Sequence, residues 1–335
     1  MQSTQRTVWF RRLALAGALL AAVVVVLGAW VRLTDAGLGC PDWPGCYGHL
    51  YPQMQHGFGK AIHEMIHRYF ASTLGLVIVS LLVWALWNRE SRDQPLIPVA
   101  FLFVIVCLQG ALGALTVTRL LKPLIVTAHL LGGLTTLATL WWLSLTPEAV
   151  PLTVGEAAGR EAGLRRFALA GMAVLFLQVT LGGWTSANYA AVACPDLPTC
   201  QQSYWPPMDF HDAFILWRGM DVDYSGGVLG NPARTAIHVT HRLGAVLTGC
   251  VLVTLGCFCI FRAERRSVRV AGRLVVLAIL LQICIGLSMV HFGMPLPLAT
   301  LHNAGAAFTV ICMVLLLRRL APRRDAPTYR GGVIP

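Results

Sequence analysis

Four histidines inside long apolar stretches are the residues best suited to chemistry in this sequence. They are His67, His129, His241 and His302. Ionisable side chains within a membrane are costly, so each marks a candidate functional site. Imidazoles on facing helices of a four-helix bundle suit ligation of a heme iron from both sides. Paired first with second and third with fourth, they predict two bis-histidine heme sites. The alternatives are plain hydrogen bonds between helices, or a zinc site that would need further cysteine or carboxylate ligands.

A carboxylate accompanies only the first pair. Glu64 precedes His67 by three residues and therefore lies on the same helix face. The matching position before His241 is occupied by His238. An acid in only one of two matching sites predicts that Glu64 takes part in catalysis there. The other interpretation is an ion pair with a neighbouring basic residue such as Arg68.

Arginines follow two of the candidate ligands. Arg68 comes after His67, and Arg242 comes after His241. A guanidinium group matches the carboxylate geometry of a heme propionate, which predicts a cofactor-binding role for both arginines. They could equally extend toward the membrane surface.

Two cysteine pairs share one spacing. Cys40 and Cys46 enclose the same number of residues as Cys194 and Cys200. Both pairs fall in loops predicted to lie outside the membrane, in an oxidising compartment where disulfides persist. We therefore predict two short-loop disulfides, with redox chemistry and simple loop closure as equally open roles.

The composition requires a membrane protein to carry these residues. Of 335 residues, 56% are hydrophobic and only 12% are charged, which excludes a water-soluble globule. Apolar stretches of bilayer-crossing length are predicted at about 13–31, 62–87, 97–117, 124–144, 167–186, 235–261, 274–292 and 298–318. Most of the 26 basic residues fall on one side of these spans. The positive-inside rule then places both termini in the cytoplasm and makes nucleic-acid binding unnecessary as an explanation of the net charge of +11.

The first apolar stretch is expected to be retained. Its apolar run is longer than a typical signal-peptide core, and no small-residue cleavage site follows it. No amphipathic, arginine- and serine-rich leader precedes it, which favours a bacterial plasma membrane.

An internal repeat organises the chain. The motif CPDWPGC at 40–46 recurs as CPDLPTC at 194–200, and the first His-Arg pair recurs 174 positions later. An even number of helices in each half makes the repeats parallel, which predicts two duplicated four-helix bundles. The predicted parts are an N-terminal bundle at 1–145, a cytoplasmic linker at 146–166, a C-terminal bundle at 167–320 and a basic cytoplasmic tail at 321–335. The external segment at 201–234 has no counterpart in the first half and is either a cap or a docking surface for a partner.

Together these motifs resemble the heme A synthase family over nearly the whole chain. The resemblance rests on EMIHR at 64–68, AH at 128–129, HR at 241–242, LHN at 301–303 and the external cysteine pairs. It implies oxidation of the C8 methyl group of heme O to the formyl group of heme A by successive hydroxylation, supplying a terminal oxidase with its cofactor.

The resemblance also implies roles for individual residues. His241 and His302 would hold a resident heme b that relays electrons, whereas His67 and His129 would hold the substrate heme O. Glu64 would act near the reacting methyl group. Cys40 and Cys46 are the better catalytic candidates among the cysteines because they share a half with Glu64.

The expected partners are heme O and heme A, heme O synthase, assembly factors of the terminal oxidase, membrane lipid and an electron carrier of unknown identity. Two other functions fit four histidines. A diheme cytochrome that passes electrons from a quinol usually places its hemes toward opposite membrane faces. These four histidines lie toward one face, because each is near the start of a span predicted to enter the membrane from the outside. A heme transporter or chaperone would leave Glu64 without a chemical task.

Overall fold

The computed structural model describes residues 2–51, 58–89, 95–146, 156–219 and 222–321. Within these ranges the chain forms helices and no strand. The helices are α1 (Gln2–Leu33), α2 (Phe58–Trp87), α3 (Leu96–Thr118), α4 (Pro123–Ser144), α5 (Glu156–Ala187), the short α6 (Phe210–Ala213), α7 (Asn231–Arg262), α8 (Arg266–His291) and α9 (Leu296–Arg319). All except α6 are long and apolar enough to cross a membrane. The predicted all-α class with eight spanning helices is confirmed for the described residues.

Local sequence explains where several helices begin. Pro123, Pro232 and Pro297 lie in the first turns of α4, α7 and α9. Proline is favoured there because its missing N–H would have no partner within the helix and its backbone angle is already helical. Hydropathy locates only the apolar part of each helix, however. As a result, α8 begins eight residues before the predicted span.

The segment between the predicted halves is partly helical. α5 begins at Glu156, inside the predicted linker at 146–166. Ion pairs join this polar end of α5 to the turn between α7 and α8: Glu161 to Arg265 at 2.7 Å and Arg160 to Glu264 at 2.8 Å. Residues 147–155 of the linker and residues 322–335 of the predicted tail lie outside the described residues.

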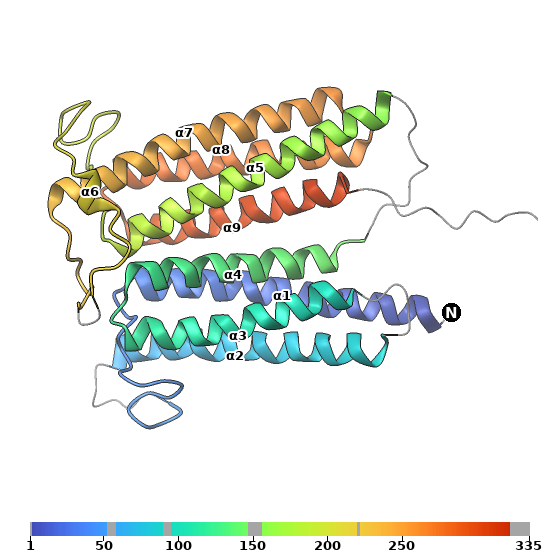
Figure 1. Ribbon diagram of the computed structural model, residues 1–335, viewed down its shortest axis with the longest axis horizontal. Coiled ribbons are helices and arrows are strands. Elements are labelled where there is room, and N and C mark those ends of the chain that lie inside the picture. The colour runs from blue at the N-terminus through green and yellow to red at the C-terminus, as the bar shows by residue number, and fades with distance from the viewer. Residues whose placement is uncertain (1, 52–57, 90–94, 147–155, 220–221, 322–335) are drawn as a thin grey trace, which may run out of the picture.

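The long helices contact one another in two sets of four (Figure 1). In the first set α1 and α3 each contact α2 and α4, so α2 and α4 are diagonal partners. In the second set α5 and α8 each contact α7 and α9, which makes α7 and α9 diagonal. Separate apolar cores fill the sets, around Leu137 and Leu140 in one and around Leu252 and Leu255 in the other. This is the grouping expected of two four-helix halves, whose bounds and common origin stay predictions.

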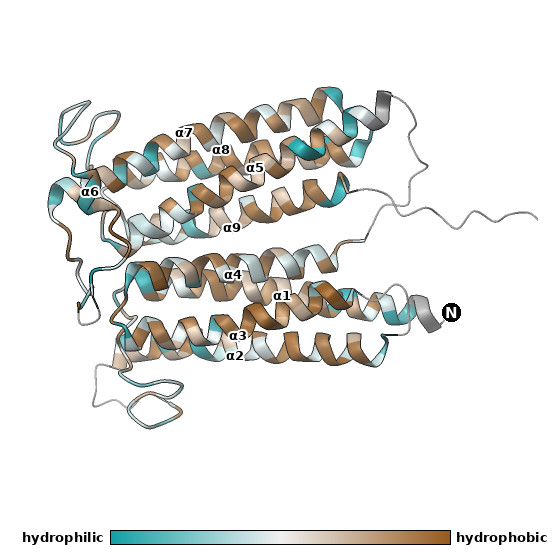
Figure 2. Ribbon diagram, in the orientation of Figure 1, coloured by the Kyte–Doolittle hydropathy of each residue, from teal (hydrophilic) through white to brown (hydrophobic). Residues whose placement is uncertain are grey.

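Polar residues concentrate toward the two ends of the helices, and apolar residues occupy their middle parts (Figure 2). The start of α1 and the end of α9 lie at one end of the molecule, and α6 with the long loops lies at the other (Figure 1). The cysteine loops therefore lie at the end opposite to these two helix termini.

Side-chain contacts join the two sets where α1 and α5 end. The Arg32 guanidinium donates to the Ser186 carbonyl at 2.6 Å and lies over the Tyr189 ring at 4.0 Å. The Tyr189 hydroxyl donates to the Asp35 carboxylate at 2.9 Å. These contacts fix the ends of α1 and α5 relative to each other beside the cavity described below.

Candidate functional site

The first histidine pair meets inside the first set of helices. His67 on α2 and His129 on α4 project from diagonal helices, and their ring centroids lie 6.5 Å apart at an interplanar angle of 82°. A metal atom bonded to two imidazole nitrogens at about 2 Å each separates the ring centroids by about 6 Å. Nδ1 of His129 is buried and has no hydrogen-bond partner among the described residues. The pair therefore has the separation that a metal held between two imidazoles requires.

A glycine on a neighbouring helix lies against each of the four histidine rings. An added Cβ at Gly28 would lie 3.0 Å from His67 Cε1, and one at Gly286 would lie 3.1 Å from His302 Cε1. Gly182 and Gly113 stand in the same relation to the second-half His241 and first-half His129, at 3.3 and 3.6 Å. The absent side chains let the rings lie close to the neighbouring backbone. Three of the four contacts would become tighter than normal if the glycine gained a Cβ.

The second pair has glutamine neighbours. Gln178 Nε2 lies 3.1 Å from His241 Nδ1 and also donates to the His241 carbonyl at 3.1 Å. Gln282 Nε2 lies 3.3 Å from His302 Nδ1 and donates to the His302 carbonyl at 3.0 Å. Such contacts orient an imidazole ligand. Gln178 could not be predicted from the repeat, because the matching position in the first half is Val24.

The donor set suits heme better than an isolated metal ion. Among the described residues, no group of three or more histidine, cysteine, aspartate or glutamate side chains is placed to hold a metal. Zinc sites use at least three protein ligands. Two imidazoles suffice for heme, because the porphyrin supplies the other ligands to iron. The residues present therefore fit a heme group.

A cavity of about 480 Å³ surrounds the first pair. Its wall includes His67 and His129, with Glu64 and Arg32. The wall also includes residues of α5 and α9 from the second set, among them Asn303. The cavity therefore brings the predicted catalytic carboxylate and one histidine pair together, bounded partly by the other set of helices.

Glu64 is held in place by two donors. Its Oε1 accepts from Arg68 Nη2 at 2.5 Å, and its Oε2 accepts from the Cys40 backbone N–H at 2.9 Å. The residue is only 4% exposed. At the matching position in the second half, His238 Nδ1 lies 3.0 Å from the Ala190 carbonyl instead. The predicted ion pair of Glu64 is present, and the carboxylate also lines the cavity, so the two interpretations are compatible.

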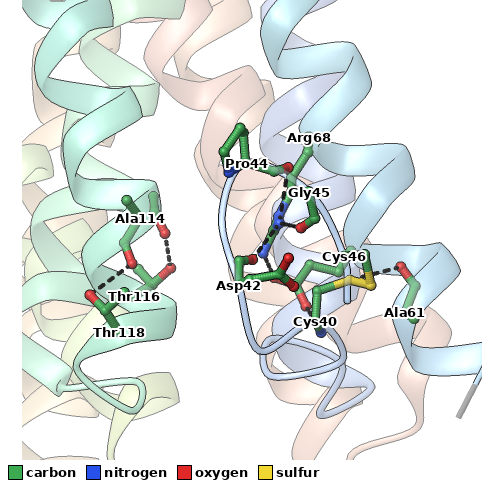
Figure 3. Close-up of polar contacts among 12 residues, drawn as sticks. Cys40, Asp42, Pro44, Gly45, Cys46, Ala61, Arg68, Ala114, Thr116 and Thr118 are labelled. Atoms are coloured by element: carbon green, nitrogen blue, oxygen red, sulfur yellow. Dashed lines mark hydrogen bonds and ion pairs between the residues drawn. A yellow bond between two sulfur atoms is a disulfide. The ribbon is translucent and has the colours of Figure 1, made fainter. Parts of the chain in front are cut away.

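The arginines after the histidines bind the disulfide loops. Arg68 Nη1 donates to the carbonyls of Asp42 and Pro44, at 2.9 and 3.2 Å, and to that of Gly45 (Figure 3). Arg242 makes the equivalent contacts in the second half, with the carbonyls of Cys194, Asp196 and Thr199. Both guanidinium groups therefore already bind backbone carbonyls. Pairing of these arginines with heme propionates stays a prediction.

Both predicted disulfides are present in the structure. Cys40 is bonded to Cys46, and Cys194 is bonded to Cys200. All four residues are buried. Figure 3 shows the first bond beside the start of α2, where Ala61 lies. A reductant in solution therefore reaches either bond only after the loop opens.

An aspartate braces each disulfide loop. The Asp42 carboxylate accepts from the backbone N–H groups of Gly48 and Tyr47, at 2.8 and 2.6 Å. The N–H of Gly48, assisted by that of Tyr47, lowers the pKa of Asp42 below its usual value. Asp196 accepts equivalent bonds from Gln201 and Gln202 in the second loop. The charged form of each aspartate therefore stabilises its loop.

This arrangement predicts that Asp42→Asn accelerates reduction of the Cys40–Cys46 bond several-fold at pH 7. The amide is a weaker acceptor than the carboxylate, so the loop opens more often. The expected difference between wild type and variant is complete above about pH 3.9, the ordinary pKa of an aspartate, and is lost as the pH falls through the lowered pKa of Asp42 in the closed loop. Alkylation and mass spectrometry after phosphine treatment give the rates. Asp196→Asn is the matched control and should affect only the second bond; equal rates for Asp42→Asn and wild type would contradict the prediction.

The described residues of the predicted external segment, 201–219 and 222–234, lie against both sets of helices. A hydrogen bond joins α6 to α5: Trp184 Nε1 donates to the Ala213 carbonyl at 3.0 Å. Further along, the buried Lys122 ammonium of the first half donates to the Gly219 carbonyl and lies 3.6 Å from the Trp217 ring centroid. Lys122 could not be predicted from the sequence, because its partners are distant in the chain. The segment covers the turn between α3 and α4, as a cap would, and its use by a partner protein stays a prediction.

Comparisons with known proteins agree with these features. A model of the cytochrome oxidase assembly protein family matches residues 11–314. The chain is 36% identical over 323 residues to a heme A synthase of Shewanella oneidensis, covering 92% of this chain and 94% of that protein. It is 26% identical over 323 residues to a heme A synthase of Geobacillus kaustophilus, covering 93% of each chain. With a family match and relatives that extend over most of its length, the chain belongs to the heme A synthase family of cytochrome oxidase assembly proteins.

Proposed function

We propose that this protein is a heme A synthase, which oxidises the C8 methyl group of heme O to the formyl group of heme A. The observation that carries the proposal is the facing His67–His129 pair in a cavity that also contains Glu64. Family membership supports the same reaction. The cavity provides a ligand pair for the substrate iron and a carboxylate on the same helix face.

The two halves have different tasks in this proposal. The N-terminal half, at 1–145, holds the substrate through His67 and His129. The C-terminal half, at 167–320, holds a heme b through His241 and His302, with the glutamine contacts fixing both rings. When bound, heme b would supply a redox centre that relays electrons.

Glu64 acts at the substrate. Arg68 and the Cys40 N–H hold its two oxygens in separate hydrogen bonds, so the carboxylate has a defined orientation in the cavity. A negative charge so placed stabilises positive charge that develops as the methyl carbon is oxidised, or accepts the proton released from that carbon. The contact with Cys40 also connects the Cys40–Cys46 loop to this task and supports a role for these cysteines near the reaction.

Arg32 is a further candidate to bind a propionate. It lines the cavity, and its Nε is buried without a hydrogen-bond partner among the described residues. Arg68, the first-half candidate from the sequence, would first have to give up its bonds to loop carbonyls, whereas Arg242 in the second half has a buried Nε without a partner in the described part of the chain, as Arg32 does. A free donor of a guanidinium group beside the porphyrin site is well suited to a carboxylate.

The protein acts from within a membrane, which we propose is the bacterial plasma membrane. The start of α1 and the end of α9 then lie on the cytoplasmic side. Its substrate would come from a heme O synthase, and its product would pass to assembly factors of a terminal oxidase. An electron carrier of unknown identity would also dock to exchange electrons with the protein.

The test is mass analysis of hemes extracted from cells that make heme O, with and without this protein. A new species with the methyl-to-formyl mass change, or its hydroxylated precursor, supports the proposal. Heme b alone, in cells where a known heme A synthase is active in parallel, would contradict it and favour an electron-transfer cytochrome.

A further inference from the structure

The gap between α2 and α3 in the first half differs from the matching gap between α7 and α8. In the repeat, His67 corresponds to His241 and Gln109 corresponds to Gln282, so α2 matches α7 and α3 matches α8. In the second half, Ile283 fills the gap: its Cδ1 lies 3.0 Å from where a Cβ on the buried Gly249 would be. The matching residues on α2 and α3 are both glycine.

These two glycines, Gly75 and Gly110, border open space. An added Cβ on either would meet no atom within 4 Å. Replacement of an isoleucine by a glycine at the matching position thus removes the side chain that closes the gap in the other half.

A second difference lies further along the same helices. α7 and α8 approach closely at Gly256 and Gly272, where an added Cβ on either glycine would lie within about 3 Å of the other's carbonyl oxygen. The matching residues of α2 and α3 are Leu82 and Val99, whose side chains pack in the core of the first half. Bulky residues therefore replace the small residues that allow close helix contact in membranes.

The opening reaches the cavity that contains His67. Four residues of α2 and α3 both line that cavity and are exposed. They are Ser72, Val79, Cys107 and Gly110. These helices are long and apolar enough to span a membrane, so an opening between them would face lipid.

We infer that the gap between α2 and α3 is a lateral opening to the lipid, through which the isoprenoid chain of the substrate enters and extends while the porphyrin binds between His67 and His129. The inference rests on the proposed function. Heme O carries a long isoprenoid chain, which heme b lacks, and an apolar chain is more stable in lipid than in water. An open first half and a closed second half match these two hemes.

The test is Gly110→Ile, which restores the residue found in the second half. We expect the dissociation constant for heme O to rise about tenfold or more, while that for added heme b changes less than about twofold. Difference spectra of the purified full-length protein, titrated with each heme, give both constants. Gly75→Leu, on the facing helix, should have the same effect. Ala111→Ile is the matched control, because this exposed neighbour does not line the cavity.

The content of resident heme b in each variant reports on folding. If Gly110→Ile loses its heme b, Gly75→Leu is used in its place. Equal weakening of heme O and heme b would show a disturbed porphyrin site and overturn the inference. Unchanged heme O binding in both variants would also overturn it. Wild-type protein that neither binds nor oxidises heme O would contradict the proposed function itself, a result distinct from unaffected variants of an active enzyme.

Discussion

Glu64→Gln is expected to retain bound heme and to lose conversion of heme O by a factor of about 10² to 10⁴, the usual contribution of a positioned acid or base. The amide oxygen can still accept the Cys40 N–H, so the loop contact is preserved. The negative charge beside the cavity is lost, together with the ion pair to Arg68. Extraction and chromatography of hemes measure conversion, and the heme absorption spectrum of the purified variant measures retention.

The matched control for this change is Glu161→Gln. Glu161, near the start of α5, forms a half-buried ion pair with Arg265 at 2.7 Å. The start of α5 lies at the opposite end of the molecule from α6 (Figure 1). This variant should convert heme O at the wild-type rate. Normal heme A production by Glu64→Gln would refute a catalytic role and leave Glu64 as a brace for the Cys40 loop.

Replacement of His241 by alanine should remove heme b from the purified protein, lowering its content about tenfold or more, as expected for loss of an axial ligand. The pyridine hemochrome spectrum measures heme b per protein. His67→Ala should instead keep heme b and lose binding of added heme O.

His291→Ala provides the control for this pair of variants. His291 is exposed at the end of α8, where its ring contacts Phe292. The same substitution there should leave both hemes in place. Undiminished heme b in His241→Ala would show that the halves have been assigned the wrong hemes.

The helices and the histidines could be predicted from the sequence because each rests on a local signal. Apolar stretches longer than a bilayer core leave little choice of structure, and a histidine within one is conspicuous. Helix ends were harder to predict. α5 begins at Glu156, well before its apolar region. Ion pairs of Glu161 and Arg160 with the turn after α7 explain this polar extension of the helix.

Partners of buried polar groups were the least predictable part of the site. Arg68 looked free to bind a propionate, whereas it binds the carbonyls of a loop more than 20 residues earlier in the chain. Lys122 carries no local signal in the sequence, yet it is buried under Trp217. Such contacts depend on how helices rotate and where loops return, and neither is encoded in a local pattern.

The contacts between the ends of α1 and α5 have a consequence for the ancestry of the chain. Arg32 and Ser186 occupy the same position of the repeat, as do Asp35 and Tyr189, and each residue contacts its own counterpart. Equivalent residues of two copies touch only where a two-fold axis passes between them. Under the predicted duplication, a four-helix precursor would have used this same surface to form a homodimer. Joining the two copies in one chain would then allow arginine at one position and serine at the other, a difference that a symmetric dimer could not maintain.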